Sequence, residues 1–394
     1  MRDHFRKLHF SLEKSFNKSP INFSFNYTLI DPGVNDISLI SNLQKFSPTK
    51  FTAVITGITG ENSEQLLRTI SLACSYLNTP LISFSSKSSL FSDKYRHKYF
   101  LRTISSSDNE MPIWELILKQ LIWDKITIIA LNTYESQLTL TQLMQDHSNK
   151  SYQVMDYKKL PPSEMELQEQ RQERIGNMLK EIKARETRAI LLYVDKQTAE
   201  LVFKQAEQNG MLAEGWGWLA SEDALAAENR PIGLLAIRPV QKDHIEQLDE
   251  ANNIVTRSIQ NLVEDEKSLD LKPESLFLRM KSYQKNGRPF FDSKGRIFSQ
   301  QYQIINVGSH RQLIPVGNYS FDQGLSLSTD KIIWPGPSNH SPNCFKKKTN
   351  LKVVTILSIP FVQARKLRDP NDACRSAGPD ELNAEVECQR YNGK

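Results

Sequence analysis

Cysteines, metal-binding patterns and long apolar runs are all scarce in this sequence of 394 residues. The four cysteines are too few for a disulfide scaffold and lack the C-x-x-C spacing of a zinc site. No apolar run reaches the roughly 18–20 residues that a helix needs to cross a bilayer. The first residues lead into no apolar segment of the kind found in signal peptides. As written, the chain is therefore predicted neither to enter the secretory pathway nor to span a membrane.

Patterns that indicate catalysis are missing as well. No two of the seven histidines have metal-ligand helical spacing, there is no H-E-x-x-H motif, and there is no G-x-S-x-G motif. The chain is therefore predicted not to be an enzyme, and no cofactor is expected. The net charge of +5 is small for this length, and the tightest basic cluster is residues 346–348. We interpret that cluster as part of a solvated linker, since a nucleic-acid binder should show a basic face with aromatic neighbours.

From residue 51 onward, short apolar runs alternate with amphipathic stretches, which is typical of an α/β fold. Helix 163–186 is expected to begin with a capping box formed by Ser163 and Glu166. Cys74 is expected to be a small core residue of the first helix. Strands are predicted at 51–56, 81–84, 99–103, 125–131, 189–194, 216–220 and 232–237. Helices are predicted at 63–77, around 114–123, at 163–186, at 196–209 and at about 243–263.

The last third of the chain has a different pattern. Residues 287–307 contain a polar turn between two strand-like segments, which predicts a hairpin. Residues 319–350 show little periodicity and are predicted to be a linker. Residues 351–357 predict a new strand, and with it the start of another domain.

A glycine-containing loop at 56–63 follows a predicted strand and precedes a predicted helix. Such a loop can present backbone N–H groups to an anionic ligand. It lacks the lysine and the spacing of a phosphate-binding loop, and a turn between strand and helix uses glycine in any case, so we favour a structural role. If the chain binds a small ligand, the weak candidates are Thr56, Gly57, Ser83 and Ser85, with Ser86 nearby.

Asn-x-Ser/Thr triplets, which can accept glycans in secreted proteins, occur six times. A proline just after the triplet lowers the odds at Asn17 and Asn339. The candidate glycosylation sites are Asn17, Asn22, Asn26, Asn149, Asn318 and Asn339.

Several segments resemble the receptor-family ligand-binding region, the two-lobed fold of periplasmic binding proteins and glutamate receptor amino-terminal domains. Residues 80–84, 90–94 and 100–103, followed by two tryptophans, are similar to its first lobe and crossover. The turn at 291–296 is similar to the one that closes its second lobe. Residues 331–336 and 351–362 resemble the linker and the first strand of the agonist-binding domain in NMDA-type ionotropic glutamate receptor subunits. The Trp-Pro-Gly triplet within 331–336 is most similar to the obligatory glycine-binding subunit, with the glycine-binding third subunit type as the close alternative.

This resemblance implies an α/β fold of two lobes, periplasmic-binding-protein type I-like, each a mainly parallel sheet flanked by helices. The chain would cross between the lobes near 105, 240 and 288. The implied domains are an amino-terminal domain at 1–318 (lobe 1 about 1–105 and 240–287, lobe 2 about 106–239 and 288–318), a linker at 319–350 and a truncated agonist-binding domain at 351–394.

The sequence also departs from the family pattern. The family's first strand and signal peptide have no counterpart in this sequence, and its agonist-contacting residues would lie beyond Lys394. Cys374 and Cys388 resemble two loop cysteines of the agonist-binding domain whose disulfide partners come later, and the pairing of Cys344 is left open. These departures predict that the sequence is a fragment.

By resemblance, the chain is the extracellular part of a cation channel subunit opened by glutamate and glycine. It would serve subunit assembly and allosteric control of gating, in a calcium-transporting glycoprotein on the extracellular side of the plasma membrane, at the postsynaptic side of a synapse. Its partners would be other NMDA-type subunits, and the full-length protein would bind glycine or glutamate. No nucleic-acid partner is expected. The protein would contact a membrane only through C-terminal segments that this sequence lacks. The alternative is a stand-alone two-lobed protein, or receptor ectodomain, that binds a small ligand such as an amino acid.

Overall fold

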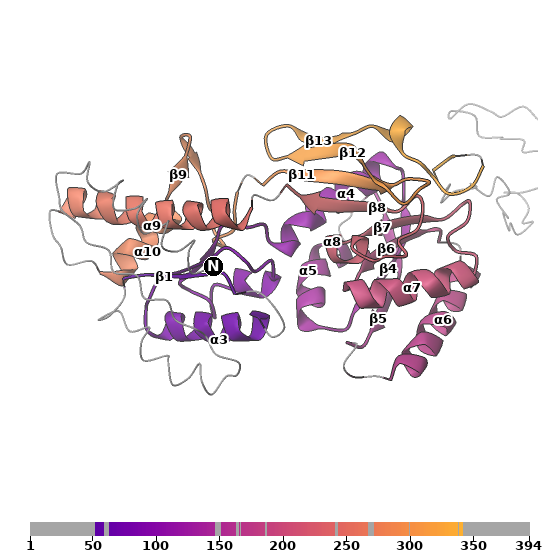
Figure 1. Cartoon of the computed structure of the whole chain (residues 1–394), viewed down its shortest axis with the longest axis horizontal. Helices are drawn as coiled ribbons and strands as arrows, with labels where there is room; N and C mark the ends of the chain where they lie inside the picture. The colour runs from indigo at the N-terminus through magenta and orange to yellow at the C-terminus, as the bar shows by residue number, and fades with distance from the viewer. Residues whose placement is uncertain are drawn as a thin grey trace, which may run out of the picture. The chain divides into compact units, whose positions relative to one another are not determined.

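The computed structural model describes residues 52–58, 63–145, 151–162, 165, 167–185, 187–240, 243–266, 272–298, 300–337 and 339–341 (Figure 1). The chain divides into two compact units, residues 1–344 and 345–394, and all described residues lie in the first. The described residues form a three-stranded, a two-stranded and an eight-stranded sheet. The two larger sheets each have their own helices and define two halves, which we call lobe 1 and lobe 2.

Lobe 1 is built on a parallel sheet of three short strands in the order β1-β2-β3, of which β2 and β3 are fully buried. Because neighbouring side chains of a strand point to opposite faces, Leu81 packs with helix α3 while Ile82 packs with helices α9 and α10. The buried thiol of Cys74 confirms the core position predicted for it in α3. The elements are β1 (Val54–Thr56), α3 (Ser63–Tyr76), β2 (Leu81–Ser83), η2 (Ser89–Ser92), β3 (Phe100–Arg102), α9 (His244–Glu266), α10 (Pro273–Lys281), β9 (Gln284–Lys285) and β10 (Arg288–Pro289).

Lobe 2 is built on a sheet of order β13-β12-β11-β8-β7-β6-β4-β5, parallel from β5 to β8 and antiparallel from β8 to β13. Along β4, Ile128 packs with α4 and α5, while Ile129 packs with α6 and α7 on the other face. The strands are β4 (Lys125–Leu131), β5 (Gln153–Leu160), β6 (Ala189–Tyr193), β7 (Gly217–Ala220), β8 (Leu235–Pro239), β11 (Tyr302–Val307), β12 (Leu313–Ser320) and β13 (Gly324–Leu327). The helices are η3 (Ser107–Glu110), α4 (Met111–Gln120), α5 (Tyr134–Met144), α6 (Gln168–Ala184), α7 (Lys196–Gln208), α8 (Glu222–Leu225) and η5 (Thr329–Lys331).

The predicted α/β fold with mainly parallel, helix-flanked sheets is confirmed. The predicted start of helix 163–186 is wrong, because α6 begins only at Gln168. Leu167 has an extended backbone (φ −64°, ψ 143°), so the helix does not run back through it. The predicted capping residues Ser163 and Glu166 lie outside the described residues.

The segment predicted as a linker, 319–350, is structured in its first part. Strand β13 lies in it and pairs with β12, because Leu327 buries its side chain in the core of lobe 2. Trp334 is also buried there, with its ring centroid 6.0 Å from that of Trp123. The strand predicted at 351–357 and three of the four cysteines, Cys344, Cys374 and Cys388, lie outside the described residues.

The third passage between the lobes comes later than the predicted residue 288. The backbone N–H of Arg102 donates to the carbonyl of Gly295 at 3.2 Å, so the turn around residue 295 is still attached to the edge of β3. The passage therefore lies between Arg296 and Tyr302, where β11 begins. Within the described ranges, no helix has the length and apolar character needed to cross a membrane.

Candidate functional site

The three strands of lobe 1 end side by side. Thr56, Ser83 and Arg102 are the last residues of β1, β2 and β3, and they are paired in register. In open α/β sheets, ligands bind outside the carboxyl ends of the strands, so this edge is the first place to look for a site.

The four residues predicted as weak ligand candidates meet at this edge, but most of them are already engaged. Thr56 and Ser83 are buried. A Cβ atom on Gly57 would lie 2.0 Å from Cζ of Phe84, so an aromatic ring covers this glycine. The Ser83 hydroxyl accepts a long hydrogen bond from the Ser85 N–H at 3.4 Å. The Ser85 hydroxyl is the exception, since it is buried and has no hydrogen-bond partner among the described residues.

Acidic residues stand at helix starts in both lobes. Glu64 lies in the first turn of α3, which follows β1, and Glu110 ends η3, which follows β3 and directly precedes α4. In lobe 2, Glu135 lies in the first turn of α5 and Glu222 begins α8. A helix N-terminus attracts negative charge, and here the chain supplies that charge itself.

Burial holds several of these carboxyl groups toward their neutral form. It raises the pKa of Glu64, whose Oε1 accepts a hydrogen bond from the Ser86 hydroxyl at 2.6 Å. It also raises the pKa of Glu135. Burial, with a smaller contribution from the Glu222 carboxylate, raises the pKa of Glu110 to about 8. Carboxyl groups that are ionised here would repel an acidic ligand, and binding one would require them to take up protons, so the arrangement disfavours binding of a carboxylate.

Arg102 is the central cation of this edge. Its guanidinium donates to the carbonyl of Ser88 and to the hydroxyl of Ser92, both at 2.6 Å. Burial lowers its pKa to about 10, so it remains charged at neutral pH. Because these two groups hold the arginine within lobe 1, its charge serves the fold of the loop between β2 and β3.

Other side chains of the same loop reach lobe 2. Lys87 forms an ion pair with Glu222 at the start of α8. The hydroxyls of Ser89 and Thr139, on α5, are 2.8 Å apart and hydrogen-bonded. The two lobes are therefore held together at this edge by the protein's own polar groups.

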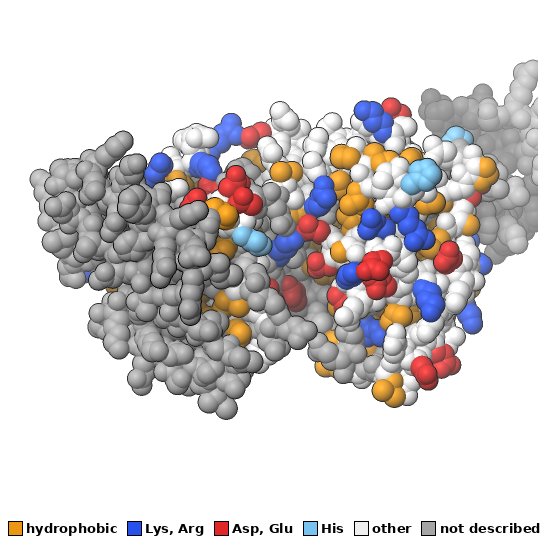
Figure 2. All heavy atoms as spheres, in the orientation of Figure 1, with side chains coloured by type: hydrophobic (Ala, Val, Ile, Leu, Met, Phe, Trp, Pro, Cys, Tyr) orange, Lys and Arg blue, Asp and Glu red, His pale blue; other side chains and the backbone are white. Residues whose placement is uncertain are grey.

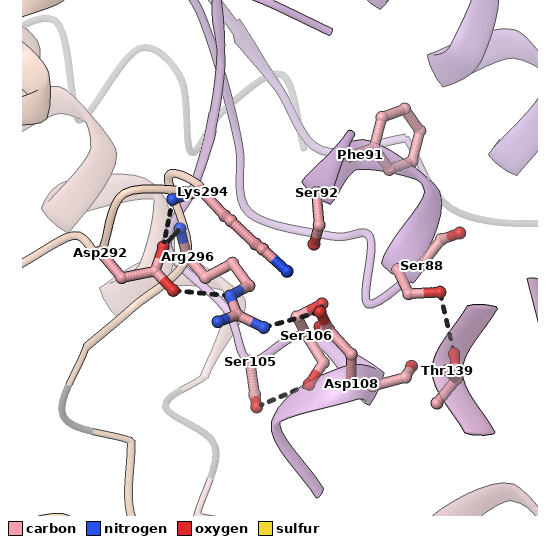
Figure 3. A network of polar contacts seen from close by, with 12 residues as sticks. Ser88, Phe91, Ser92, Ser105, Ser106, Asp108, Thr139, Asp292, Lys294 and Arg296 are labelled. Carbon is pink, nitrogen blue, oxygen red and sulfur yellow. Dashed lines mark hydrogen bonds and ion pairs between the residues drawn. The ribbon is translucent and has the colours of Figure 1, made fainter. Parts of the chain in front are cut away.

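A second polar network lies where the chain passes between the lobes, and Figure 3 shows Arg296 between Asp292 and Asp108. The Arg296 guanidinium donates to Asp108 at 2.6 Å and to Asp292 at 2.7 Å. These three side chains are each less than a fifth exposed.

Asp292 and Arg296 lie in the turn 291–296, which was singled out by its resemblance and not for its charges. The other carboxyl groups and Arg102 carry no sequence signal beyond the ordinary preference of a helix start for an acidic residue. Figure 2 shows acidic and basic side chains interspersed on the visible face of the described residues. In the part of the chain that the structure describes, no group of three or more His, Cys, Asp or Glu residues could hold a metal ion.

Two of the six predicted glycosylation sites fall in the described part. Asn318 lies in β12 with an exposed side chain. Asn339 is also exposed, but its Oδ1 accepts a hydrogen bond from the Trp334 N–H at 2.7 Å. The other four candidates, Asn17, Asn22, Asn26 and Asn149, lie outside the described residues.

The sequence matches a known protein family and several known receptor subunits. Residues 16–269 match the family described as the receptor family ligand binding region. Over 370 residues, the chain is 25% identical to glutamate [NMDA] receptor subunit 1 of Drosophila persimilis, covering 88% of this chain and 36% of that protein. It is 25% identical to the same subunit of Drosophila virilis, covering 88% and 37%, and 24% identical to that of Drosophila erecta, covering 88% and 36%. The chain thus spans little more than a third of the length of these relatives.

Proposed function

The chain belongs to the family described as the receptor family ligand binding region, and we propose that it is the extracellular amino-terminal part of an NMDA-type glutamate receptor subunit. The observation that carries this proposal is the similarity to glutamate [NMDA] receptor subunit 1, which extends over 88% of the chain. In the complete protein, this region would belong to a cation channel opened by glutamate and glycine, located in the plasma membrane. The subunit would be of the glycine-binding type.

Within such a channel, the region would serve subunit assembly and allosteric control of gating rather than agonist recognition. The buried carboxyl groups of Glu64, Glu110 and Glu135 support this assignment, because they disfavour a second carboxylate at the strand ends. The ion pair between Lys87 and Glu222 supports it as well, since protein groups take up the polar contacts there.

Co-purification tests the assembly role. The full chain would be expressed behind a secretion signal together with a tagged NMDA-type subunit of another kind, with glutamate [NMDA] receptor subunit 1 of Drosophila persimilis as the positive control. We expect the chain to be recovered with the tagged subunit and to compete with the positive control. Secretion of a folded chain that never co-purifies, while the control does, would refute the assignment.

The second candidate is a stand-alone protein that binds a small amino acid between its lobes. It is favoured by one observation, the buried Ser85 hydroxyl without a partner at the strand ends. Calorimetric titration of the full chain with glycine and with glutamate tests it. Saturable binding that is lost in Ser85→Ala would favour this candidate over the assembly role.

A further inference from the structure

Within the part of the chain that the structure describes, the polypeptide passes between the two lobes at three places, and two of these passages lie against each other. The first passage leads from Arg102 at the end of β3 into η3, and the third leads from the turn at 292–296 into β11. Ser105, on the first passage, is hydrogen-bonded to the hydroxyl of Tyr302 at the start of β11. The relative orientation of the lobes therefore depends on how these two passages are held.

The turn at 292–296 is a rigid element fixed to lobe 1. Asp292 Oδ1 accepts hydrogen bonds from the N–H groups of Lys294 at 2.8 Å and Arg296 at 2.9 Å. Gly295 has a φ of +69°, and a Cβ atom there would lie 2.9 Å from the carbonyl oxygen of Phe100. The turn needs glycine both for its backbone angle and for its close approach to β3.

Arg296 projects from this turn to the first passage. Its Nε donates to Asp292 within the turn at 2.7 Å, and its NH1 donates to Asp108 in η3 at 2.6 Å (Figure 3). The Ser106 hydroxyl donates to the other oxygen of Asp108, so this carboxylate is held from two sides. Although burial alone would lower it, the two carboxylates raise the pKa of Arg296, and the group is a permanent cation.

The planar guanidinium is suited to this position. It presents donors in a fixed fork and can bridge two carboxylates in different directions, whereas a lysine ammonium is a point charge on a flexible stem. Since Arg296 joins the turn of lobe 1 to the segment that opens lobe 2, rotation of one lobe against the other would stretch or break its bond to Asp108.

We propose that Arg296, clamped between Asp292 and Asp108, is a brace across two interlobe passages that sets the angle between the lobes and limits their hinge motion. Hinges are short segments whose backbone angles absorb a domain rotation, and a brace across two of them restricts that freedom. This inference concerns the stiffness of the chain itself and goes beyond the assembly role proposed above.

The test is a distance measurement on the full chain. Spin labels on unnatural amino acids would replace Tyr95 of lobe 1, which is 95% exposed, and Lys204 of lobe 2, which is exposed on α7. Pulsed electron resonance then reports the distribution of distances between the lobes. Asp108→Asn keeps the shape of the side chain and removes the charge, while Arg296→Lys keeps the charge and removes the fork.

The matched control is Arg279→Gln. It removes an exposed ion pair between Arg279 and Asp265 that joins α10 to α9 within lobe 1. We expect a narrow distribution for the unsubstituted chain and for this control, and a broadened or displaced one for both brace variants. Amide exchange at Arg102, whose N–H bonds the turn within lobe 1, should stay unchanged in Asp108→Asn and so shows that the turn itself is intact in that variant.

Distributions for Asp108→Asn and Arg296→Lys that coincide with that of the unsubstituted chain would overturn the proposal. If Arg296→Lys does not fold, Asp108→Asn decides alone, since it leaves the turn and its Asp292 contacts intact. Because the readout needs no partner subunit, failure of this proposal is distinct from failure of the assembly role.

Discussion

The buried carboxyl group of Glu110 should make the stability of this protein depend on pH in an unusual direction. Glu110 is only 6% exposed, and its pKa is raised from 4.5 to about 8 by burial, with Glu222 adding to the shift and Lys87 opposing it. The folded state therefore holds a proton that the unfolded state has lost between pH 4.5 and about 8. In this window stability is highest at the acidic end and declines as pH rises.

The size of the effect follows from the shift. One pKa unit corresponds to about 1.4 kcal/mol, so raising the pH from 5 to 7.5 should lower the free energy of unfolding by up to about 3 kcal/mol through Glu110 alone. Glutamine has nearly the same shape as a protonated glutamic acid and cannot ionise. Glu110→Gln should therefore match the unsubstituted protein at pH 5 and exceed it in stability by a few kcal/mol at pH 7.5.

Urea unfolding followed by circular dichroism at pH 5, 6, 7 and 7.5 measures this difference. Glu169→Gln, an exposed residue in the first turn of α6, is the matched control and should keep the pH dependence of the unsubstituted protein. Other titrating groups contribute equally to both proteins and cancel in the difference. If Glu110→Gln loses stability between pH 5 and 7.5 as steeply as the unsubstituted chain, Glu110 does not hold a proton in the folded state and the reasoning is wrong.

Three further outcomes are expected. Burial lowers the pKa of His97 from 6.5 to about 4, so its contribution to stability is present above pH 6.5 and lost as pH falls toward 4. His97→Gln should therefore reduce the pH dependence of the free energy of unfolding between pH 6.5 and about 4, and an unchanged slope would contradict this. Gly57→Ala should destabilise by about 1–3 kcal/mol in urea unfolding, because its Cβ would meet the Phe84 ring, and unaltered stability would show that the ring gives way. In secreted protein, Asn318→Gln should remove one glycan from the pattern released by an endoglycosidase, and an identical gel shift before and after substitution would exclude this site.

Local patterns were enough to predict much of the fold. Strand β4 lies at 125–131 as expected, since its apolar run is long and turns bound it. Helix α7, predicted at 196–209, ends at Gln208, and Gly210 follows with a φ of +67°, the left-handed conformation that glycine adopts readily after a helix. Strand β5, residues 153–160, was missed because it is the polar edge of its sheet and is mostly exposed or half-buried.

The α/β class can be predicted from local sequence, because strands and amphipathic helices each have a characteristic hydrophobic period. The positions of Thr56, Gly57, Ser83 and Ser85 at or just after strand ends can be predicted as well, since a strand ends where its apolar run ends. What surrounds these residues depends on tertiary packing. The bond between Arg296 and Asp108 joins side chains 188 positions apart, and no local period encodes it. The raised pKa of Glu110 likewise arises from burial between elements distant in sequence, a property of the assembled fold rather than of any segment.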